Sequence, residues 1–248
     1  MKLKGKTAVI TGAGRGIGRA AAIALAKEGC NIVLAAIEAD QIEAVAEEVR
    51  AQGAEALAVR TDIQHKAEVQ ALAKAAIDRF GAVDILMNNA GVAIHNSIPN
   101  IKEEDWDWMM AINLKGTFLC TQAFFQHMCD RRSGHIVNIV SRAGKVASAK
   151  FGAYAASKFG MLGFTQTTDA EGLEFGVKAT AVCPGAADTQ QRAENHVDDH
   201  AKLLQPEDVA DYVTFIVTRP HRVYIGEVSL VPQDMKPRPT GGQLKPGI

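Results

Sequence analysis

Residues 7–18 read TAVITGAGRGIG, a short apolar run that leads directly into a turn containing four glycines. The run is typical of a buried parallel strand, and residues 19–28 after the turn are alanine-rich, as expected of a helix that ends at Gly29. Strand, glycine-rich turn and helix in this order are the context of a dinucleotide-binding motif. Glycines let the backbone approach a pyrophosphate, and the helix N-terminus offers it N–H groups and the positive end of a dipole. We therefore place a cofactor site at Gly12, Gly16, Ile17 and Gly18 and reject a plain glycine-rich turn.

Further apolar runs alternate with helical segments along the rest of the chain. We expect strands at 31–36, 56–59, 83–87, 135–140, 177–182 and 223–231. We expect helices at 39–52, 69–80, 103–119 with an extension towards Met128, around Tyr154, and at 206–218. Strands that alternate with helices form parallel sheets with both faces covered. The pattern predicts an α/β fold, a Rossmann-type doubly wound parallel sheet of about seven strands with helices on both faces.

Composition limits the class of protein. The chain has 248 residues, of which 47% are hydrophobic and 22% charged, with a net charge of −1. This balance gives no reason to expect nucleic acid or a membrane as a partner. No apolar run reaches the ~20 residues that span a bilayer, no signal peptide is evident, and the four cysteines are scattered, so we expect a cytoplasmic protein with reduced thiols. We expect one domain over residues 1–231, a mobile lid over 186–205, and a loosely structured Pro/Gly-rich tail over 232–248.

The end of the second predicted strand bears on cofactor choice. An acidic residue there commonly holds the ribose 2′-hydroxyl of NAD, but this chain has Ala36 and Ile37. Arg15, in the glycine turn, can reach a 2′-phosphate through a charge-assisted hydrogen bond. We therefore place Arg15 and Ile37 beside the adenosine ribose and predict that NADP(H) is favoured. NAD(H) is the alternative, because Glu38 can replace the missing carboxylate.

Tyr154 and Lys158 form the candidate reactive pair. Residues at i and i+4 share one face of a helix, so the tyrosine hydroxyl and the lysine ammonium should lie together. A nearby cation lowers the pKa of a phenol, which then exchanges a proton with an alcohol or carbonyl oxygen. Ser141 ends the fifth predicted strand, at the edge where open α/β sheets bind ligands. The spacing alone would favour a buried tyrosine beside a solvated lysine, but the neighbouring motifs outweigh it.

Several other polar or aromatic residues have a structural interpretation. We expect Trp106 and Trp108 in the core or in an interface, and Asn113 reads in isolation as a satisfied structural asparagine. His196 and His200 could share a metal on a helix, but no third ligand is evident, and we predict no metal. Arg131 and Arg132 are interpreted as a solvated turn, with docking of an acidic carrier protein as the alternative.

Together these motifs resemble the short-chain dehydrogenases/reductases, over residues 5 to about 231. Thr11-Gly12-x-x-x-Gly16-x-Gly18 matches the cofactor turn of the family, and Asp62-Ile63 matches the pair that flanks the adenine. Asn88-Asn89-Ala90-Gly91 and Pro184-Gly185 with Thr189 match two further cofactor segments. The catalytic tetrad of the family is matched by Asn113, Ser141, Tyr154 and Lys158. In general pattern the likeness is greatest to 3-oxoacyl-[acyl-carrier-protein] reductases, but such likeness transfers substrate identity poorly.

The resemblance implies an NAD(P)-dependent oxidoreductase that interconverts a small-molecule carbonyl and a secondary alcohol by hydride transfer. Tyr154 would be the general acid or base, and Lys158 would hold the nicotinamide ribose and lower the Tyr154 pKa. Ser141 would hydrogen-bond the substrate oxygen, and Asn113 would anchor a water in a proton relay from Lys158. The cofactor positions so implied are Gly12, Arg15, Gly16, Ile17, Gly18, Ile37, Asp62, Ile63, Asn89, Ala90, Gly91, Tyr154, Lys158, Pro184, Gly185 and Thr189.

The resemblance also implies a homotetramer or dimer, with Phe118, Phe124 and Phe125 as candidate contacts. Leu230-Val231-Pro232-Gln233 departs from the Asp-Gly-Gly that many members carry after the last strand. Two rival functions remain open at this point. A dinucleotide-sensing regulator without catalysis would not need the tetrad, and a sugar-nucleotide epimerase would usually need a longer chain.

Overall fold

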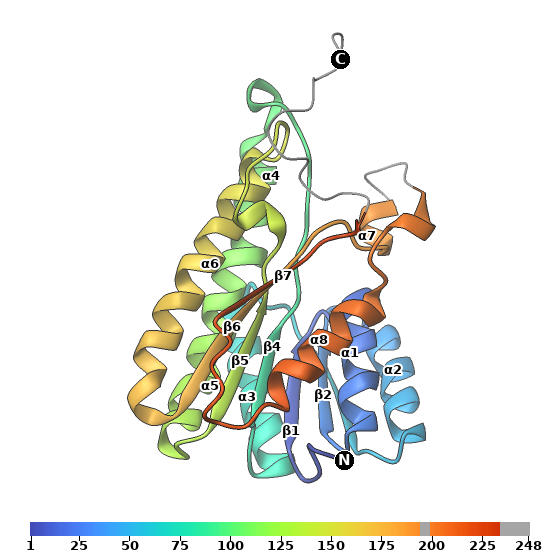
Figure 1. Cartoon of the computed structure of the whole chain (residues 1–248), viewed down its shortest axis with the longest axis vertical. Helices are drawn as coiled ribbons and strands as arrows, with labels where there is room; N and C mark the ends of the chain where they lie inside the picture. Colours follow the sequence, from blue (N-terminus) through green and yellow to red (C-terminus); the bar gives the residue numbers. More distant parts are fainter. Residues whose placement is uncertain (194–198, 234–248) are drawn as a thin grey trace.

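A computed structural model describes residues 1–193 and 199–233, and these residues form one parallel sheet. Its seven strands lie in the order β3-β2-β1-β4-β5-β6-β7, and every neighbouring pair is parallel (Figure 1). The predicted doubly wound α/β architecture is confirmed. The strands are β1 (Thr7–Thr11), β2 (Asn31–Ala36), β3 (Ala56–Arg60), β4 (Ile85–Asn88), β5 (Gly134–Ile139), β6 (Val177–Pro184) and β7 (Glu227–Leu230).

Helices cover both faces of the sheet (Figure 1). On one face lie α1 (Gly16–Lys27), α2 (Ala39–Ala51) and α8 (Pro206–Val217). On the other lie α3 (Lys66–Phe80), α5 (Thr117–Asp130) and α6 (Gly152–Gly172), with α4 (Glu103–Met109) towards the carboxyl ends of the strands. Side chains alternate between these layers: Ala8 and Ile10 of β1 join the core under α1, whereas Val9 joins the core under α3 and α5. Because both faces are buried, the strands read as continuous apolar runs.

The predicted helix at 103–119 extends in the structure to Asp130, but it is not uniform. Between α4 and α5 the backbone forms a π-helical segment at Met110–Gly116. Such segments are rare and are frequent at functional sites, and this one carries Asn113. The sequence of residues 103–119 does not predict this π-helical segment, because a π-turn depends on the contacts that the helix makes with other segments.

The predicted last strand at 223–231 is shorter in the structure. Residues before β7 form a turn in which Val223 N donates to Pro220 O at 2.9 Å, and pairing with β6 covers only Glu227–Leu230. The predicted tail at 232–248 lies outside the described residues after Gln233, so its expected looseness remains a prediction.

Arg132 and Arg131 form an exposed turn after α5, as predicted, but Arg131 also makes specific contacts. Its guanidinium donates to Val83 O and to the Asp84 carboxylate, both at 3.1 Å. Asp84 also accepts from Lys6 Nζ and from Thr7 N, so this cluster ties α5 to the start of β1. Because the Asp84 carboxylate is buried, it needs a cation beside it, and Arg131 supplies one.

The four cysteines are buried and unpaired, as expected of reduced thiols.

None of the helices within residues 1–193 and 199–233 combines the length and the apolar character that crossing a bilayer requires.

The sheet order places a crevice between β1 and β4. From β1 the chain winds outward to β2 and β3, and from β4 it winds in the opposite direction to β5, β6 and β7. In open α/β sheets, loops that leave adjacent strands in opposite directions open a crevice at the carboxyl ends of these strands, and ligands bind there.

Candidate active site

A cleft of ≈ 670 Å³ opens at the carboxyl ends of the strands. Its volume is in the range of small-molecule and cofactor sites. All of the predicted site residues line it except Gly18 and Asn113. Segments that are far apart in the sequence, from the glycine turn to the residues after β6, therefore meet in one site.

The glycine turn packs too closely for side chains. Gly12 has φ +61°, and a Cβ on it would stand 2.8 Å from Ala90 Cα. A Cβ on Gly18 would stand 2.3 Å from Gly12 O and 2.6 Å from Asn89 Nδ2. Asn89 Nδ2 donates to Thr11 O at 2.9 Å and to Gly12 O at 3.0 Å, which locks the turn to the loop after β4. Gly18 therefore packs against the turn without lining the cleft, whereas Gly16 and Ile17 at the start of α1 line the cleft.

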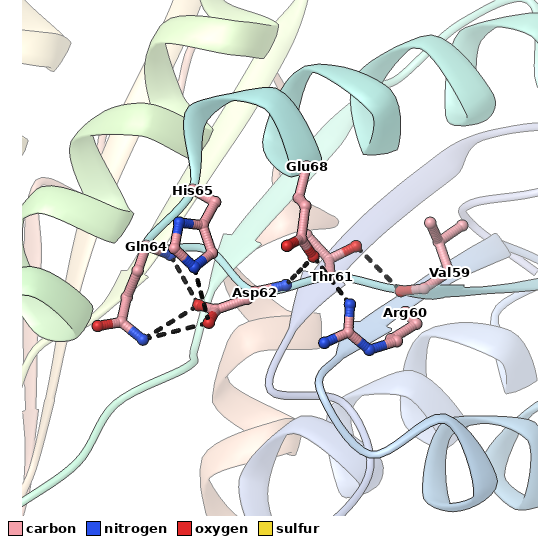
Figure 2. Close-up of polar contacts among 7 residues, drawn as sticks. All are labelled: Val59, Arg60, Thr61, Asp62, Gln64, His65 and Glu68. Atoms are coloured by element: carbon pink, nitrogen blue, oxygen red, sulfur yellow. Dashed lines mark hydrogen bonds and ion pairs between the residues drawn. The ribbon is translucent and has the colours of Figure 1, made fainter.

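At the other side of the turn, Asp62 is held in a network after β3 (Figure 2). Its carboxylate accepts from Gln64 N at 2.9 Å and from Gln64 Nε2 at 3.2 Å, and its own main-chain N donates to Glu68 at 2.9 Å. Glu68 also accepts from Arg60 Nη1 at 3.1 Å (Figure 2). The network fixes the wall of the cleft that Asp62 and Ile63 form.

Beside this wall the predicted ribose-binding residues are accessible. Arg15 is exposed, the Ile37 side chain is 54% exposed, and both line the cleft together with Glu38. Gln41 of α2 lines it too and packs against Gly14, where an added Cβ would be 2.9 Å from Gln41 Cβ. Sequence reasoning missed Gln41. Its place in the first turn after Glu38 is the one signal that could have found it.

Ser141, Tyr154 and Lys158 meet at the β5 side of the cleft. Ser141 Oγ accepts from Ala143 N at 3.0 Å, which orients this side chain. Lys158 is only 3% exposed, and its Nζ donates to Ile139 O at 2.9 Å. Burial lowers the pKa of Lys158 to about 8.

The expected lowering of the Tyr154 pKa is wrong for this structure. Burial raises the pKa of the phenol above its usual value, and the hydrogen bond with Ser141 opposes this only in part. Tyr154 and Lys158 do share one helix face, but Lys158 Nζ lies 5.9 Å from the Tyr154 ring centroid and bonds to the main chain of β5. The tyrosine is therefore held in its neutral, proton-carrying form.

Asn113 stands behind the cleft, fully buried. Its Oδ1 accepts from Val92 N at 2.8 Å, and its Nδ2 donates to Val92 O at 2.9 Å and to Ser157 Oγ at 3.0 Å. A Cβ on Gly91 would lie 3.2 Å from Asn113 Oδ1 and 3.4 Å from Lys158 Nζ. The π-helical segment thus joins the loop after β4 to the helix that carries Tyr154 and Lys158.

A family model described as short chain dehydrogenase matches residues 6–200. This chain belongs to the short-chain dehydrogenase family. A 3-oxoacyl-[acyl-carrier-protein] reductase of Synechocystis sp. is 37% identical over 230 residues, which cover 90% of this chain and 93% of that protein.

Solved structures agree with this assignment. An alcohol dehydrogenase from the archaeon Thermococcus sibiricus, complexed with 5-hydroxy-NADP, has a TM-score of 0.88 at 29% identity and covers 94% of this chain and 99% of its own. A metagenomic short-chain oxidoreductase in complex with NADP has a TM-score of 0.83 at 34% identity, with the same coverage. This short-chain dehydrogenase is an NAD(P)-dependent oxidoreductase.

The wall opposite the glycine turn contains residues that sequence reasoning missed. The rings of His95 and Phe151 stack with centroids 4.0 Å apart, and His95 meets the edge of Tyr154 at 6.0 Å. Trp108 also lines the cleft with 41% of its surface exposed, so it is not in the core. Trp106 is 38% exposed and is not in the core either, and the alternative of an interface stays a prediction for both. These residues come from separate segments, and only the fold brings them together.

The predicted lid is described in two pieces. Ala187 pairs with Leu204, and Asp188 N donates to Leu204 O at 2.7 Å, so the two ends of this segment lie together. Thr189 sits over the glycine turn, 3.4 Å from where a Cβ on Gly16 would stand, and α7 (Gln190–Ala193) follows it. Ala186, Ala187 and Thr189 line the cleft of this short-chain dehydrogenase, and the mobility of the predicted lid remains a prediction.

The predicted histidine pair falls partly outside the described residues, because His196 lies in 194–198. His200 Nδ1 pairs with Asp188 Oδ1 at 2.8 Å. Over the residues that the structure does describe, no group of three or more possible metal ligands occurs.

Proposed function

We propose that this short-chain dehydrogenase reduces a small carbonyl compound to a secondary alcohol with NADP(H), and that Tyr154 is the proton donor. The proposal rests on one observation above all. A neutral, partly buried tyrosine lies in the same cleft as the glycine turn, with Ser141 beside it and a buried lysine one helical turn on.

The residues of the cleft fit a dinucleotide. The turn at Gly12 and Gly18 has no room for a Cβ, which is what close approach of backbone to a pyrophosphate requires. We assign the pyrophosphate to the turn and to the start of α1, and the adenine to Asp62 and Ile63. The nicotinamide end is assigned to Asn89, Ala90, Gly91, Pro184, Gly185 and Thr189. When bound, the nicotinamide supplies the hydride chemistry.

The side chains at the β5 side supply the proton chemistry. Ser141 holds the carbonyl oxygen of the substrate, and the neutral Tyr154 donates a proton to this oxygen as negative charge develops on it. The raised pKa keeps the phenol protonated at neutral pH, and the protonated phenol is the form that reduction uses. The same groups would catalyse the reverse reaction, so reduction is proposed as the direction with NADPH.

Lys158 and Asn113 support the proton donor. Lys158, with its pKa of about 8, is mostly charged at neutral pH and is assigned to the nicotinamide ribose hydroxyls. The amide oxygen of Asn113 and Lys158 Nζ flank the same point beside Gly91. We propose that a water anchored by Asn113 returns protons to Lys158 across this short path.

The preference for NADP(H) over NAD(H) is part of the proposal. Arg15 is exposed at the mouth of the cleft, and Ile37 cannot repel a 2′-phosphate. The two related structures hold NADP or a derivative of it. Glu38 opposes the preference, because its carboxylate lines the same wall.

A homotetramer or dimer is also proposed. Phe118 on α5 is 39% exposed and Phe159 on α6 is 45% exposed, so exposed apolar side chains are available for an interface on the α5 and α6 side of the sheet. Phe124 is fully buried and Phe125 packs on the core, so these two do not support the assembly. Sedimentation at micromolar concentration should give a mass at least twice 26.5 kDa, and a monomer alone would refute it.

The function is tested with purified protein, NADPH or NADH, and a panel of aldehydes, ketones, oxo acids and oxo esters. We expect NADPH oxidation that depends on one or more of these carbonyls, with a lower KM for NADPH than for NADH. Tight binding of NADPH with no turnover of any carbonyl would instead support a regulator that senses the cofactor.

A further inference from the structure

Arg142 directly follows Ser141 and lines the cleft. Its side chain is partly buried, and within residues 1–193 and 199–233 it makes neither a hydrogen bond nor an ion pair. Arginines elsewhere in the chain bind carboxylates, as Arg19 does with Glu48, or main-chain oxygens, as Arg132 does with Glu174. Among the described residues, the guanidinium groups of Arg15 and Arg222 also make no such contact, but both residues are exposed, whereas Arg142 is partly buried at the reacting end of the cleft.

The charge around Arg142 makes the exception stronger. Among the described residues that line the cleft, Glu38 and Asp62 alone are acidic, and both follow strands on the far side of β1. Three strand spacings separate β2 from β5, which is about 14 Å. This exceeds the Debye length of about 8 Å at physiological ionic strength, so Glu38 does little to neutralise Arg142. Lys158 lies on the same side of the cleft as Arg142 and adds positive charge.

The backbone holds Arg142 in place beside the reacting centre. Arg142 opens a short 3-10 turn, and its carbonyl oxygen accepts from Lys145 N at 2.9 Å and from Val146 N at 3.0 Å. Its Cα is about 3.8 Å from that of Ser141. Because both residues line the cleft, a group bound by the guanidinium would lie in the same cavity as an oxygen that Ser141 and Tyr154 hold.

We propose that Arg142 binds a carboxylate on the substrate, so that the enzyme acts on oxo acids in preference to neutral carbonyl compounds. A planar guanidinium matches a carboxylate with two parallel hydrogen bonds, and a cleft with an excess of cations attracts anions. The inference rests on the proposed function and adds the substrate class to it. Arg142 is a specificity residue here, not a proton donor.

The test compares 2-, 3- and 4-oxo acids with their methyl esters, using NADPH and the full-length protein. Wild type should show a higher kcat/KM for at least one acid than for its ester, by tenfold or more. Arg142→Gln should lower kcat/KM for that acid about 10- to 100-fold, mostly through KM, because charged hydrogen bonds are worth about 1.5–3 kcal/mol. The ester should change less than threefold, and Arg142→Lys should be intermediate.

Lys145→Gln is the matched control, because it removes the same charge three residues on from a side chain that pairs with Glu227 and does not line the cleft. It should leave the preference for the acid unchanged. A second readout uses Tyr154→Phe loaded with NADPH, where calorimetry measures the Kd of the acid without turnover. Adding Arg142→Gln should raise the Kd of the acid but leave the Kd of the ester unchanged.

The inference is overturned if wild type prefers the esters, if Arg142→Gln affects acid and ester equally, or if it weakens NADPH instead. These results can be distinguished from those that would refute the proposed function itself. Reduction of neutral ketones or aldehydes without any preference for acids would leave the function standing and remove the inference. No NADPH-dependent turnover of any carbonyl would remove the function, and the inference with it.

Discussion

The two ends of the cleft are built in opposite ways. At the β5 end, Lys158 is 3% exposed and donates to a main-chain oxygen, and Asn113 is fully buried with both amide atoms bonded. At the adenosine end, Ile37 is 54% exposed and Arg15 lies in solvent. The reacting groups are therefore positioned by the core, whereas recognition of the ribose depends on surface side chains.

This contrast decides how strongly each end can act. Buried polar groups interact in a low local dielectric, so their contributions are large and their removal is costly. Exposed charges are screened by water and salt, so each contributes little. The reaction class should then be hard to change by mutation, and the preference between NADPH and NADH should be easy to change.

Tyr154→Phe should have the largest effect. It removes the transferable proton and keeps the ring, so we expect turnover to fall by ~10²-fold or more, the scale of general acid catalysis. The Kd for NADPH should change little, because the glycine turn and Asp62 are untouched. Near-normal turnover in a folded, NADPH-binding Tyr154→Phe protein would show that the buried end is not where proton transfer occurs.

Lys158→Met tests whether a buried charge is held at a cost to stability. The folded-state pKa of about 8 lies below the usual value of 10.5, so between these pH values the unfolded chain binds more protons. Wild-type stability should then rise with pH across this window relative to the variant, by about 2–3 kcal/mol between pH 7 and pH 10.

Urea denaturation of both proteins at pH 7 and pH 10 measures this difference, and titration of other groups cancels between them. An equal pH dependence in the two proteins would mean that Lys158 is solvated and not buried.

Gly18→Ala tests the rigid support behind the cofactor turn. The new Cβ would stand 2.3 Å from Gly12 O, so the turn must shift, at a cost of about 1–3 kcal/mol in stability. NADPH affinity should fall with it. Gly163→Ala is the control: it lies in α6 with nothing within 4 Å of the added Cβ and should stabilise by about 0.5–1 kcal/mol. Equal effects of the two changes in melting experiments would contradict the close packing of the turn.

Arg15→Ala should have the smallest effect and the most selective one. An exposed guanidinium on a 2′-phosphate is worth about 1–2 kcal/mol, so NADPH affinity should fall roughly five- to thirtyfold. NADH, which lacks the phosphate, should bind as before. Titration of wild type and variant with both cofactors decides this, and the assignment fails if NADH already binds wild type as tightly as NADPH or if both weaken equally.

The parts of this molecule that were predictable from sequence are those that local chemistry dictates. Continuous apolar runs such as Thr7–Thr11 occur because the sheet is buried on both faces, and the glycine turn because no Cβ fits between Gly18 and Gly12. Tyr154 and Lys158 were placed on one face by helix periodicity alone, and the structure keeps them in one cleft.

The parts that escaped prediction depend on packing between distant segments. The pKa of Tyr154 is raised because the fold buries it, and Lys158 finds an oxygen of β5 that spacing could not reveal. Trp108 was expected in the core or in an interface, yet α4 presents it to the cleft. The π-helical turn around Asn113 likewise follows from its tie to Val92.

Transfer of an isotopic label tests the central claim most directly. NADPH carrying deuterium at the hydride position of C4 is incubated with the enzyme and a carbonyl that it consumes, and the alcohol product is examined by mass spectrometry and NMR. The account predicts one deuterium on the carbinol carbon with wild type, and formation of that product at least 10²-fold more slowly with Tyr154→Phe at saturating NADPH. An alcohol without the label, or equal rates in the two proteins, would contradict it.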